Sequence, residues 1–260
     1  MNKTNFHTHH YLCGHADGNA SDYVLEAIKN GYTAIGISDH GPLPNPPFPR
    51  MTIQEFENIY LKDIDDSKQK YSDKIKIYKG VEIEYLYGYD DFYVMLKNKL
   101  DYMALALHYY SGDELTTASK SSYNVNSHDA LTEYTKLAVD AMSTGLFKIF
   151  VHPDMFMIGY PSFDSYAEEC VNKIIEAAIK YDVALEFNAE GIRKGVKKFP
   201  NREDDYWYPN KEFWKFVSKS SVKVIVGSDC HKPHLLDDEC MNRARMLANE
   251  YNLNLINSIF

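Results

Sequence analysis

Four histidines and an aspartate lie close together near the start of the sequence, in the stretch HTHHYLCGHADG that begins at residue 7. They are His7, His9, His10, His15 and Asp17, in a chain of 260 residues with ten histidines in total. Imidazole and carboxylate groups are common ligands of zinc, manganese and iron. The cluster therefore predicts either a metal-scavenging tail or one corner of a metal site whose other ligands lie elsewhere in the chain.

The elements that would position further ligands are short apolar runs separated by helix-length amphipathic segments. Seven runs read as strands, at residues 4–9, 32–40, 75–85, 101–108, 146–154, 182–190 and 222–231. Three segments read as helices from apolar spacing and end signals, at residues 21–31, 52–71 and 165–182. Strands that alternate with helices are typical of a parallel sheet with crossover helices. We therefore expect one α/β domain over residues 1–260, built as a seven-stranded (β/α) barrel similar to a TIM barrel.

Every predicted strand ends on side chains that could bind a metal. In chain order they are His7 and His9, Asp39 and His40, Glu82 and Glu84, His108, His152 and Asp154, Glu186 and Asn188, and Asp229 and His231. The carboxyl ends of the strands of such a barrel meet on one face. A single buried histidine is more often structural than a ligand, and an acidic residue at a strand end can cap the next helix. Neither explanation accounts for all seven strand ends, so the sequence predicts a multinuclear metal site.

Charge and composition narrow the class of partner. The formal net charge is −9, and a basic cluster such as RKGVKK at 193–198 is too short to bind a nucleic-acid duplex. The four cysteines are scattered, which is typical of a reducing cytoplasm. Residues 1–6 do not resemble a signal peptide, and no apolar stretch reaches the roughly 18 residues of a membrane span. We expect a cytoplasmic protein with a small-molecule partner, and no nucleic acid or membrane partner.

Five stretches resemble the successive motifs of the polymerase-and-histidinol-phosphatase (PHP) superfamily. They are FHTHHYLCGHADG, AIGISDHGPLP, KIYKGVEIEY, VHPD and VGSDCHKP. Within that superfamily, residues 38–85, 185–195 and 208–213 are similar to the monofunctional histidinol-phosphatases. The chain departs from the family at Asn5, where an aspartate is usual, and in ALALHYY, which lacks a Gly-Ser pair before His108. Neither departure removes a predicted ligand.

The resemblance implies a distorted barrel that holds three divalent metal ions, zinc, manganese or iron. The implied ligands are His7, His9, Glu82 and Asp229 for the first ion, Glu82, His108 and His152 for the second, and His15, His40 and His231 for the third. Asp17 and Asp39 would not bind metal themselves but would orient the rings of ligand histidines through hydrogen bonds.

The activity that the resemblance implies is hydrolysis of L-histidinol phosphate to L-histidinol and inorganic phosphate, a step of histidine biosynthesis. Metal ions would neutralise the phosphate and supply a bridging hydroxide as the nucleophile. The expected catalytic residues are Asp229, as proton acceptor, and His231. Arg193 is expected to bind the phosphate through its forked guanidinium, with Asn188 as a second substrate contact, and Lys194 to face solvent. Arg50 follows the second strand and could approach the same face.

Other functions stay open from the sequence. A related enzyme could act on another small phosphate monoester or on oligonucleotide ends. An amidohydrolase-like enzyme usually needs a ligand lysine at a strand end, which none of the seven runs supplies. A metal-binding protein without activity is a third alternative. The loops at 41–51, 109–128 and 191–210 are rich in aromatic residues and would suit a cationic amino-imidazole, although they would suit other amines too.

Overall fold

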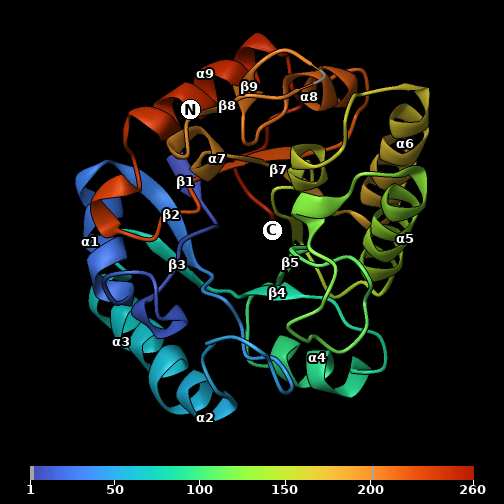
Figure 1. Cartoon of the computed structure of the whole chain (residues 1–260). Coiled ribbons are helices and arrows are strands. Elements are labelled where there is room, and N and C mark those ends of the chain that lie inside the picture. Colours follow the sequence, from blue (N-terminus) through green and yellow to red (C-terminus); the bar gives the residue numbers. More distant parts are fainter. Residues whose placement is uncertain (1–2, 201) are drawn as a thin grey trace.

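The computed structural model describes residues 3–200 and 202–260, and its strands run parallel in two neighbouring sheets (Figure 1). The first sheet has the order β1-β2-β3 and consists of β1 (Lys3–Asn5), β2 (Tyr32–Ile37) and β3 (Lys76–Lys79). The second has the order β10-β7-β6-β5-β4 and consists of β4 (Glu82–Glu84), β5 (Ala104–Ala106), β6 (Ile149–Phe150), β7 (Ala184–Asn188) and β10 (Val224–Gly227). A separate antiparallel pair is formed by β8 (Val196–Lys197) and β9 (Asp205–Tyr206).

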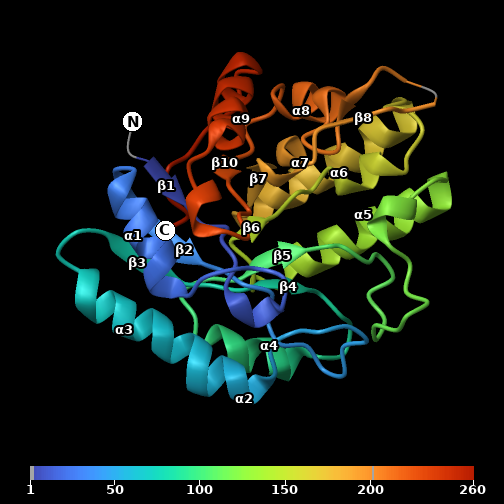
Figure 2. The ribbon, with the colours of Figure 1, turned by 60° about the vertical axis from the view of Figure 1, so that its left-hand side comes forward.

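Helices surround the strands (Figures 1 and 2). They are α1 (Ala20–Lys29), α2 (Ile53–Glu55), α3 (Leu61–Tyr71), α4 (Asp90–Lys97), α5 (His128–Ser143), α6 (Ser165–Tyr181), α7 (Glu190–Arg193), α8 (Lys211–Val217) and α9 (Glu239–Glu250). Local sequence accounts for several of the helix starts. Asn19 caps α1 in a reciprocal pair of hydrogen bonds with Asp22, and the Asp164 carboxylate accepts a hydrogen bond from the Ala167 amide at the start of α6. The longer helices, such as α1, α5, α6 and α9, contribute buried apolar side chains to the main core.

Two isolated bridges connect the two sheets near the carboxyl ends of their strands. Thr8 pairs with Cys230, and His40 pairs with Glu82, both in the parallel sense. β3 and β4 belong to one stretch of chain that is interrupted at Gly80. The ring of Tyr102 packs so closely on Gly80 that any side chain there would overlap it. Tyr102 also donates a hydrogen bond to the Phe6 carbonyl at 2.6 Å, so it holds both sheets together.

The α/β class with parallel strands is confirmed. A strand overlaps each predicted run, although each is shorter than predicted, β1 begins one residue before its run and the run at 75–85 is divided into β3 and β4. The predicted helices at 21–31 and 165–182 correspond to α1 and α6. The predicted helix at 52–71 instead forms α2, a π-helical turn at Phe56–Tyr60 and α3. Among the described residues, no helix is both long enough and apolar enough to cross a membrane.

Candidate metal centre

The predicted ligands meet where the parallel strands end. His7 and His9 follow β1, Glu82 lies on β4, His152 follows β6 and Asp229 follows β10. These five side chains are all buried. Because every strand of the two sheets points in the same direction, residues far apart in the sequence arrive at one place. The opening histidine cluster is therefore part of a built site.

The first group of donors surrounds a point between β1, β4 and β10. His9 Nε2 lies 2.8 Å from Asp229 Oδ1, and His7 Nε2 lies 3.5 Å from the same oxygen. Glu82 Oε2 lies 3.5 Å from His7 Nε2 and 3.6 Å from His9 Nε2. Glu82 Oε2 also lies 2.9 Å from His40 Nδ1, but within the described part of the chain neither this oxygen nor His7 Nε2 has a hydrogen-bond partner of good geometry, and both atoms are buried. Buried polar atoms are rarely left without a partner, and this pair faces the point that a cation would occupy.

The second group uses the other oxygen of the same glutamate. Glu82 Oε1 lies 2.9 Å from His152 Nε2 and 3.6 Å from His108 Nε2. Since Glu82 Oε2 faces His7 and His9, its two oxygens point at two different donor groups. This carboxylate can therefore bridge two cations.

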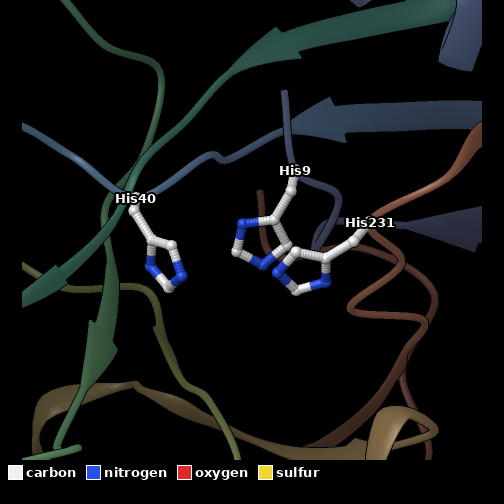
Figure 3. Close-up of side chains that lie close together, drawn as sticks. All are labelled: His9, His40 and His231. Carbon is white, nitrogen blue, oxygen red and sulfur yellow. The ribbon is translucent and has the colours of Figure 1, made fainter. Parts of the chain in front are cut away.

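The third group consists of histidines nearer the surface. Figure 3 shows His40 and His231 on either side of His9, and one donor atom of each of these three rings lies within 4.8 Å of the others. The ring centre of His15 lies 5.3 Å from that of His40 and 4.9 Å from that of His231. The structure thus brings together the predicted set of His15, His40 and His231, and it adds His9 to their surroundings.

Carboxylates behind the rings fix their orientation. His7 Nδ1 lies 2.8 Å from Glu186 Oε1, His9 Nδ1 lies 3.2 Å from Asp39 Oδ1, and His108 Nδ1 lies 2.6 Å from Glu84 Oε1. With Nδ1 held in this way, each ring presents Nε2 to the centre. Asp39 is thus where the sequence predicts it.

Two residues of the cluster near the start of the sequence, Asp17 and His10, lie outside the metal centre. The Asp17 side chain is 71% exposed and its partner is Lys232, at 3.6 Å, so the expectation that Asp17 orients a ring is wrong. The turn at Tyr11–Cys13 and the backbone bond from the Asp17 amide to the His231 carbonyl leave its carboxylate facing outward. His10, which the sequence also leaves out of the site, binds Asp63 on α3 at 3.0 Å.

The charges of the centre favour bound cations. Burial alone would raise the pKa of Glu82, but the neighbouring His40 and His7 hold it well below its usual value. The pKa of Asp229 is likewise well below normal, because His7 and His9 outweigh its burial. Burial tends to lower the pKa of His7, yet Asp229, Glu186 and Glu82 raise it well above normal, so these carboxylates attract a proton that a metal ion would replace. Burial lowers the pKa of His231 to about 3, helped by the charge of His9, so its ring is neutral. Anionic carboxylates and a neutral imidazole are the forms that bind metal.

The two predicted substrate contacts need correction. Arg193 Nε donates to Asp238 Oδ2 at 2.7 Å, and its Nη2 donates to Ser228 Oγ at 3.0 Å and to the Leu235 carbonyl at 2.9 Å. Its side chain is 9% exposed. The guanidinium therefore fastens α7 to the segments before α9 and after β10, and it does not face the substrate space.

Asn188 is also fully buried. Its amide donates to Glu186 Oε2 at 2.7 Å and to Asp229 Oδ2 at 3.1 Å, and its oxygen accepts a hydrogen bond from the Glu190 amide. The residue thus positions Asp229 and has no free group for a substrate.

A cavity of about 310 Å³ opens over the donor groups. One wall carries the ligand candidates, and the other consists of Tyr123, Met155, Glu190, Lys194 and Tyr208. Lys194 is exposed, as expected, and it also lines the cavity, where it donates a hydrogen bond to the Tyr208 hydroxyl at 3.1 Å. Tyr123 and Tyr208 lie in the aromatic-rich loops 109–128 and 191–210 that the sequence offers for the substrate, although it did not single out either residue. A larger groove of about 510 Å³ between α5 and α6 contains none of the candidate ligands.

Comparisons with known proteins agree with this arrangement. The family model for the PHP domain matches residues 5–190. The protein named "Histidinol-phosphatase" of Bacillus subtilis is 23% identical over 265 residues, which cover 89% of this chain and 94% of that protein. The "Probable histidinol-phosphatase" of Deinococcus radiodurans is 25% identical over 236 residues, covering 87% and 85% of the two chains.

A solved structure shares the fold. It is the histidinol phosphate phosphatase of Lactococcus lactis, complexed with zinc, L-histidinol and phosphate, with a TM-score of 0.71 at 18% identity, covering 98% of this chain and 95% of that one. The family model itself spans well over half of the present sequence, from the first His-x-His to α7. The chain therefore belongs to the PHP domain family.

Proposed function

We propose that this protein is a metal-dependent phosphoric monoester hydrolase that converts L-histidinol phosphate to L-histidinol and inorganic phosphate. The observation that carries the proposal is the position of Glu82, whose two oxygens face two histidine groups at the floor of one cavity. Relatives that cover most of the chain are named histidinol-phosphatases, and one related structure holds zinc, L-histidinol and phosphate. The choice of substrate follows from the names of these relatives, and the metal-dependent mechanism follows from the donor groups of this chain.

The donor sets fit three divalent cations. We assign His7, His9, Glu82 and Asp229 to the first, Glu82, His108 and His152 to the second, and His15, His40 and His231 to the third. Bound there, the cations would neutralise the phosphate and lower the pKa of coordinated water. Mixed imidazole and carboxylate donors suit zinc, manganese or iron.

Asp229 is the proton acceptor in this proposal. Its low pKa keeps it anionic, and Asn188 holds its Oδ2 at 3.1 Å, while its Oδ1 faces His9. The carboxylate is thus fixed beside the reacting position, where it can take the proton of the attacking water. His231 is neutral, which suits a ligand better than a proton donor to the leaving group.

The cavity wall beyond the donors would hold the leaving group. Glu190 Oε2 accepts a hydrogen bond from Arg193 Nη1 at 3.2 Å, and its other oxygen can accept one from an amine. Tyr123 and Tyr208 offer aromatic surface to an imidazole. Lys194 adds a positive charge to this wall, which Arg193 does not line. The walls of the cavity are therefore compatible with both ends of L-histidinol phosphate.

We further infer that the strands close into a distorted seven-stranded barrel and that residues 1–260 form a single domain. Counting β3 and β4 as one interrupted strand gives seven, and the Thr8–Cys230 and His40–Glu82 bridges support continuous pairing between the sheets. We also place the protein in the cytoplasm, because its four cysteines are unpaired.

The experiment that tests the function is phosphate release by metal-stripped protein, with and without added manganese or zinc. Substrates are L-histidinol phosphate, p-nitrophenyl phosphate, sugar phosphates and a short oligonucleotide. We expect metal-dependent turnover with kcat/KM highest for L-histidinol phosphate by orders of magnitude. Glu82→Gln should abolish turnover, and Asp17→Asn, which changes an exposed carboxylate, should match the wild type. Slow and equal hydrolysis of all small phosphates, or preference for the oligonucleotide, would instead favour another phosphoesterase of the family.

A further inference from the structure

A second cavity adjoins the metal centre on the side of His40 and His108. Its volume is about 240 Å³, and its own wall is formed by Phe48, Arg50, Tyr109 and Ser121. It shares His40, His108, Tyr123 and Met155 with the larger cavity. A ligand seated over the donor groups is therefore within reach of side chains from both cavities.

Arg50, the basic residue of the second cavity, has no ionic partner among the described residues. Within residues 3–200 and 202–260, no carboxylate lies within 4.0 Å of the Arg50 guanidinium and no hydrogen bond engages it. Two other arginines do have an ionic partner: Arg193 pairs with Asp238 at 2.7 Å, and Arg245 pairs with Asp237 at 2.6 Å. In a chain with a net charge of −9, an unpaired guanidinium at the mouth of the site is available for an anion.

Aromatic stacking holds Arg50 in place. Its guanidinium carbon lies 5.1 Å from the centre of the Phe48 ring. Phe48 in turn stacks on Tyr109, with ring centres 5.7 Å apart and planes inclined by 10°. A guanidinium stacked on a ring keeps the N–H donors at its edge free for hydrogen bonds.

The positive charge of Arg50 lies beside the metal-binding side chains. His40 and His108 line the same cavity as Arg50, whereas Glu190 lies in the wall of the larger cavity. A guanidinium attracts anions and repels amines, so this side of the centre favours the phosphate end of a substrate.

We propose that Arg50 is a phosphate-binding residue of this enzyme. Its edge donors would bind oxygens of a phosphate group seated over the His40 and His108 side of the centre. The amine of the substrate is then directed away from Arg50 and toward Glu190, which fixes the direction in which the substrate lies. The inference rests on the proposed function for the identity of the ester, but the phosphate subsite itself does not depend on the leaving group.

The test measures phosphate binding without turnover. Metal-loaded wild type, Arg50→Met and Arg50→Lys are titrated with inorganic phosphate by isothermal calorimetry, and phosphate inhibition is measured with whichever ester is hydrolysed. We expect Arg50→Met to weaken phosphate binding about 10- to 100-fold, from the loss of charge-assisted hydrogen bonds. Arg50→Lys should lose less, because it keeps the charge but not the fork. KM should rise more than kcat falls.

The matched control is Arg243→Met, which removes an exposed arginine from α9 and should bind phosphate like the wild type. Metal content and thermal unfolding are measured for each variant, and affinities are compared at equal metal occupancy. Phosphate affinity of Arg50→Met within twofold of the wild type would overturn the proposal. So would a loss of L-histidinol affinity with phosphate affinity unchanged, since the leaving group would then occupy this cavity. If the wild type shows Arg50-dependent phosphate binding but does not hydrolyse L-histidinol phosphate, the subsite stands and the substrate assignment fails.

Discussion

His7, His9 and His108 each depend on a carboxylate for their orientation, and Glu186, the partner of His7, serves two donor groups at once. Its Oε1 lies 2.8 Å from His7 Nδ1, and its Oε2 accepts a hydrogen bond from the His152 amide at 3.2 Å. It also accepts a hydrogen bond from Asn188, which holds Asp229. One buried carboxylate therefore connects ligands of the first and second groups.

We expect Glu186→Gln to weaken metal binding about 10- to 100-fold while leaving the fold intact. The amide keeps the size of the side chain but lacks the negative charge that makes His7 a stronger ligand. Zinc affinity is measured by competition with a chromogenic chelator, and turnover should return at high metal concentration. Glu176→Gln, at an exposed position on α6, is the control. An unchanged affinity in Glu186→Gln would show that the carboxylate has no influence on the ligands.

Neighbouring residues Arg193 and Lys194 should behave differently when each is changed to methionine. Arg193→Met leaves Asp238 without its partner and should lower the free energy of unfolding by about 3–5 kcal/mol. Lys194→Met removes a charge from the cavity wall and should lower kcat/KM by about tenfold or more, with little change in stability. Urea unfolding and steady-state kinetics on both variants distinguish these outcomes. A stable but inactive Arg193→Met would restore the role that the sequence suggests for it.

The sequence predicts which residue types form the centre. It does not predict which of the adjacent basic residues Arg193 and Lys194 faces the substrate. His7, His9, Glu82, His152 and Asp229 could be placed because strand ends in a parallel fold converge. Arg193 and Lys194 lie on the same short helical turn, and their directions are decided by a partner distant in sequence, Asp238. Nothing local to the motif contains that information.

At the scale of elements, the exit of β6 is fastened to the start of α8 by Asp154. Asp154 Oδ2 accepts hydrogen bonds from the Asn210 amide and from Trp214 Nε1, the latter at 3.0 Å. The carboxyl group is fully buried, and its burial outweighs these bonds and raises its pKa to about 7. The sequence places Asp154 among the metal-type residues, whereas the structure uses it to connect two elements.

The raised pKa of Asp154 predicts a pH dependence of stability. Between pH 4 and 7 the folded protein keeps a proton that the unfolded chain releases, so this contribution is full below the unfolded pKa and is lost as pH rises through about 7. Asp154→Asn is neutral at every pH. We therefore expect its stability relative to the wild type to rise by about 2–3 kcal/mol from pH 5 to pH 8. Urea unfolding of both proteins at the two pH values measures this difference, and a constant difference would contradict it.

Element boundaries were less predictable than element types. The segment 52–71 has a helical pattern throughout, yet it contains a π-helical turn at Phe56–Tyr60. The Tyr60 hydroxyl there donates to the Gly80 carbonyl at 2.8 Å and accepts a hydrogen bond from the Asp39 amide at 3.0 Å. The run at 75–85 is interrupted near Gly80 because Tyr102 packs on it. Both irregularities come from contacts between elements, which periodicity along one segment does not show.

At the scale of the whole molecule, metal binding and sheet pairing share the same residues. His40 and Glu82 are ligand candidates and also form the bridge between β2 and β4. Thr8 and Cys230, the other bridge, each lie next to ligand candidates, and the Asp229 amide donates to the His7 carbonyl at 2.9 Å. The two sheets are thus joined at the metal centre, and their cohesion should depend on what the centre holds.

Removal of metal should therefore destabilise the entire chain in one step. Without cations, the charges of the buried carboxylates Glu82 and Asp229 are balanced mainly by neighbouring histidines such as His7. A ligand that binds only the folded state adds about 2.7 kcal/mol at a concentration of 100 times its Kd. We expect chelation to lower the midpoint of thermal unfolding by several degrees, with a single transition before and after, and zinc or manganese to restore it. Calorimetry with far-ultraviolet circular dichroism follows both. Two separate transitions would contradict a single domain, and an unchanged midpoint would contradict metal binding at the junction of the sheets.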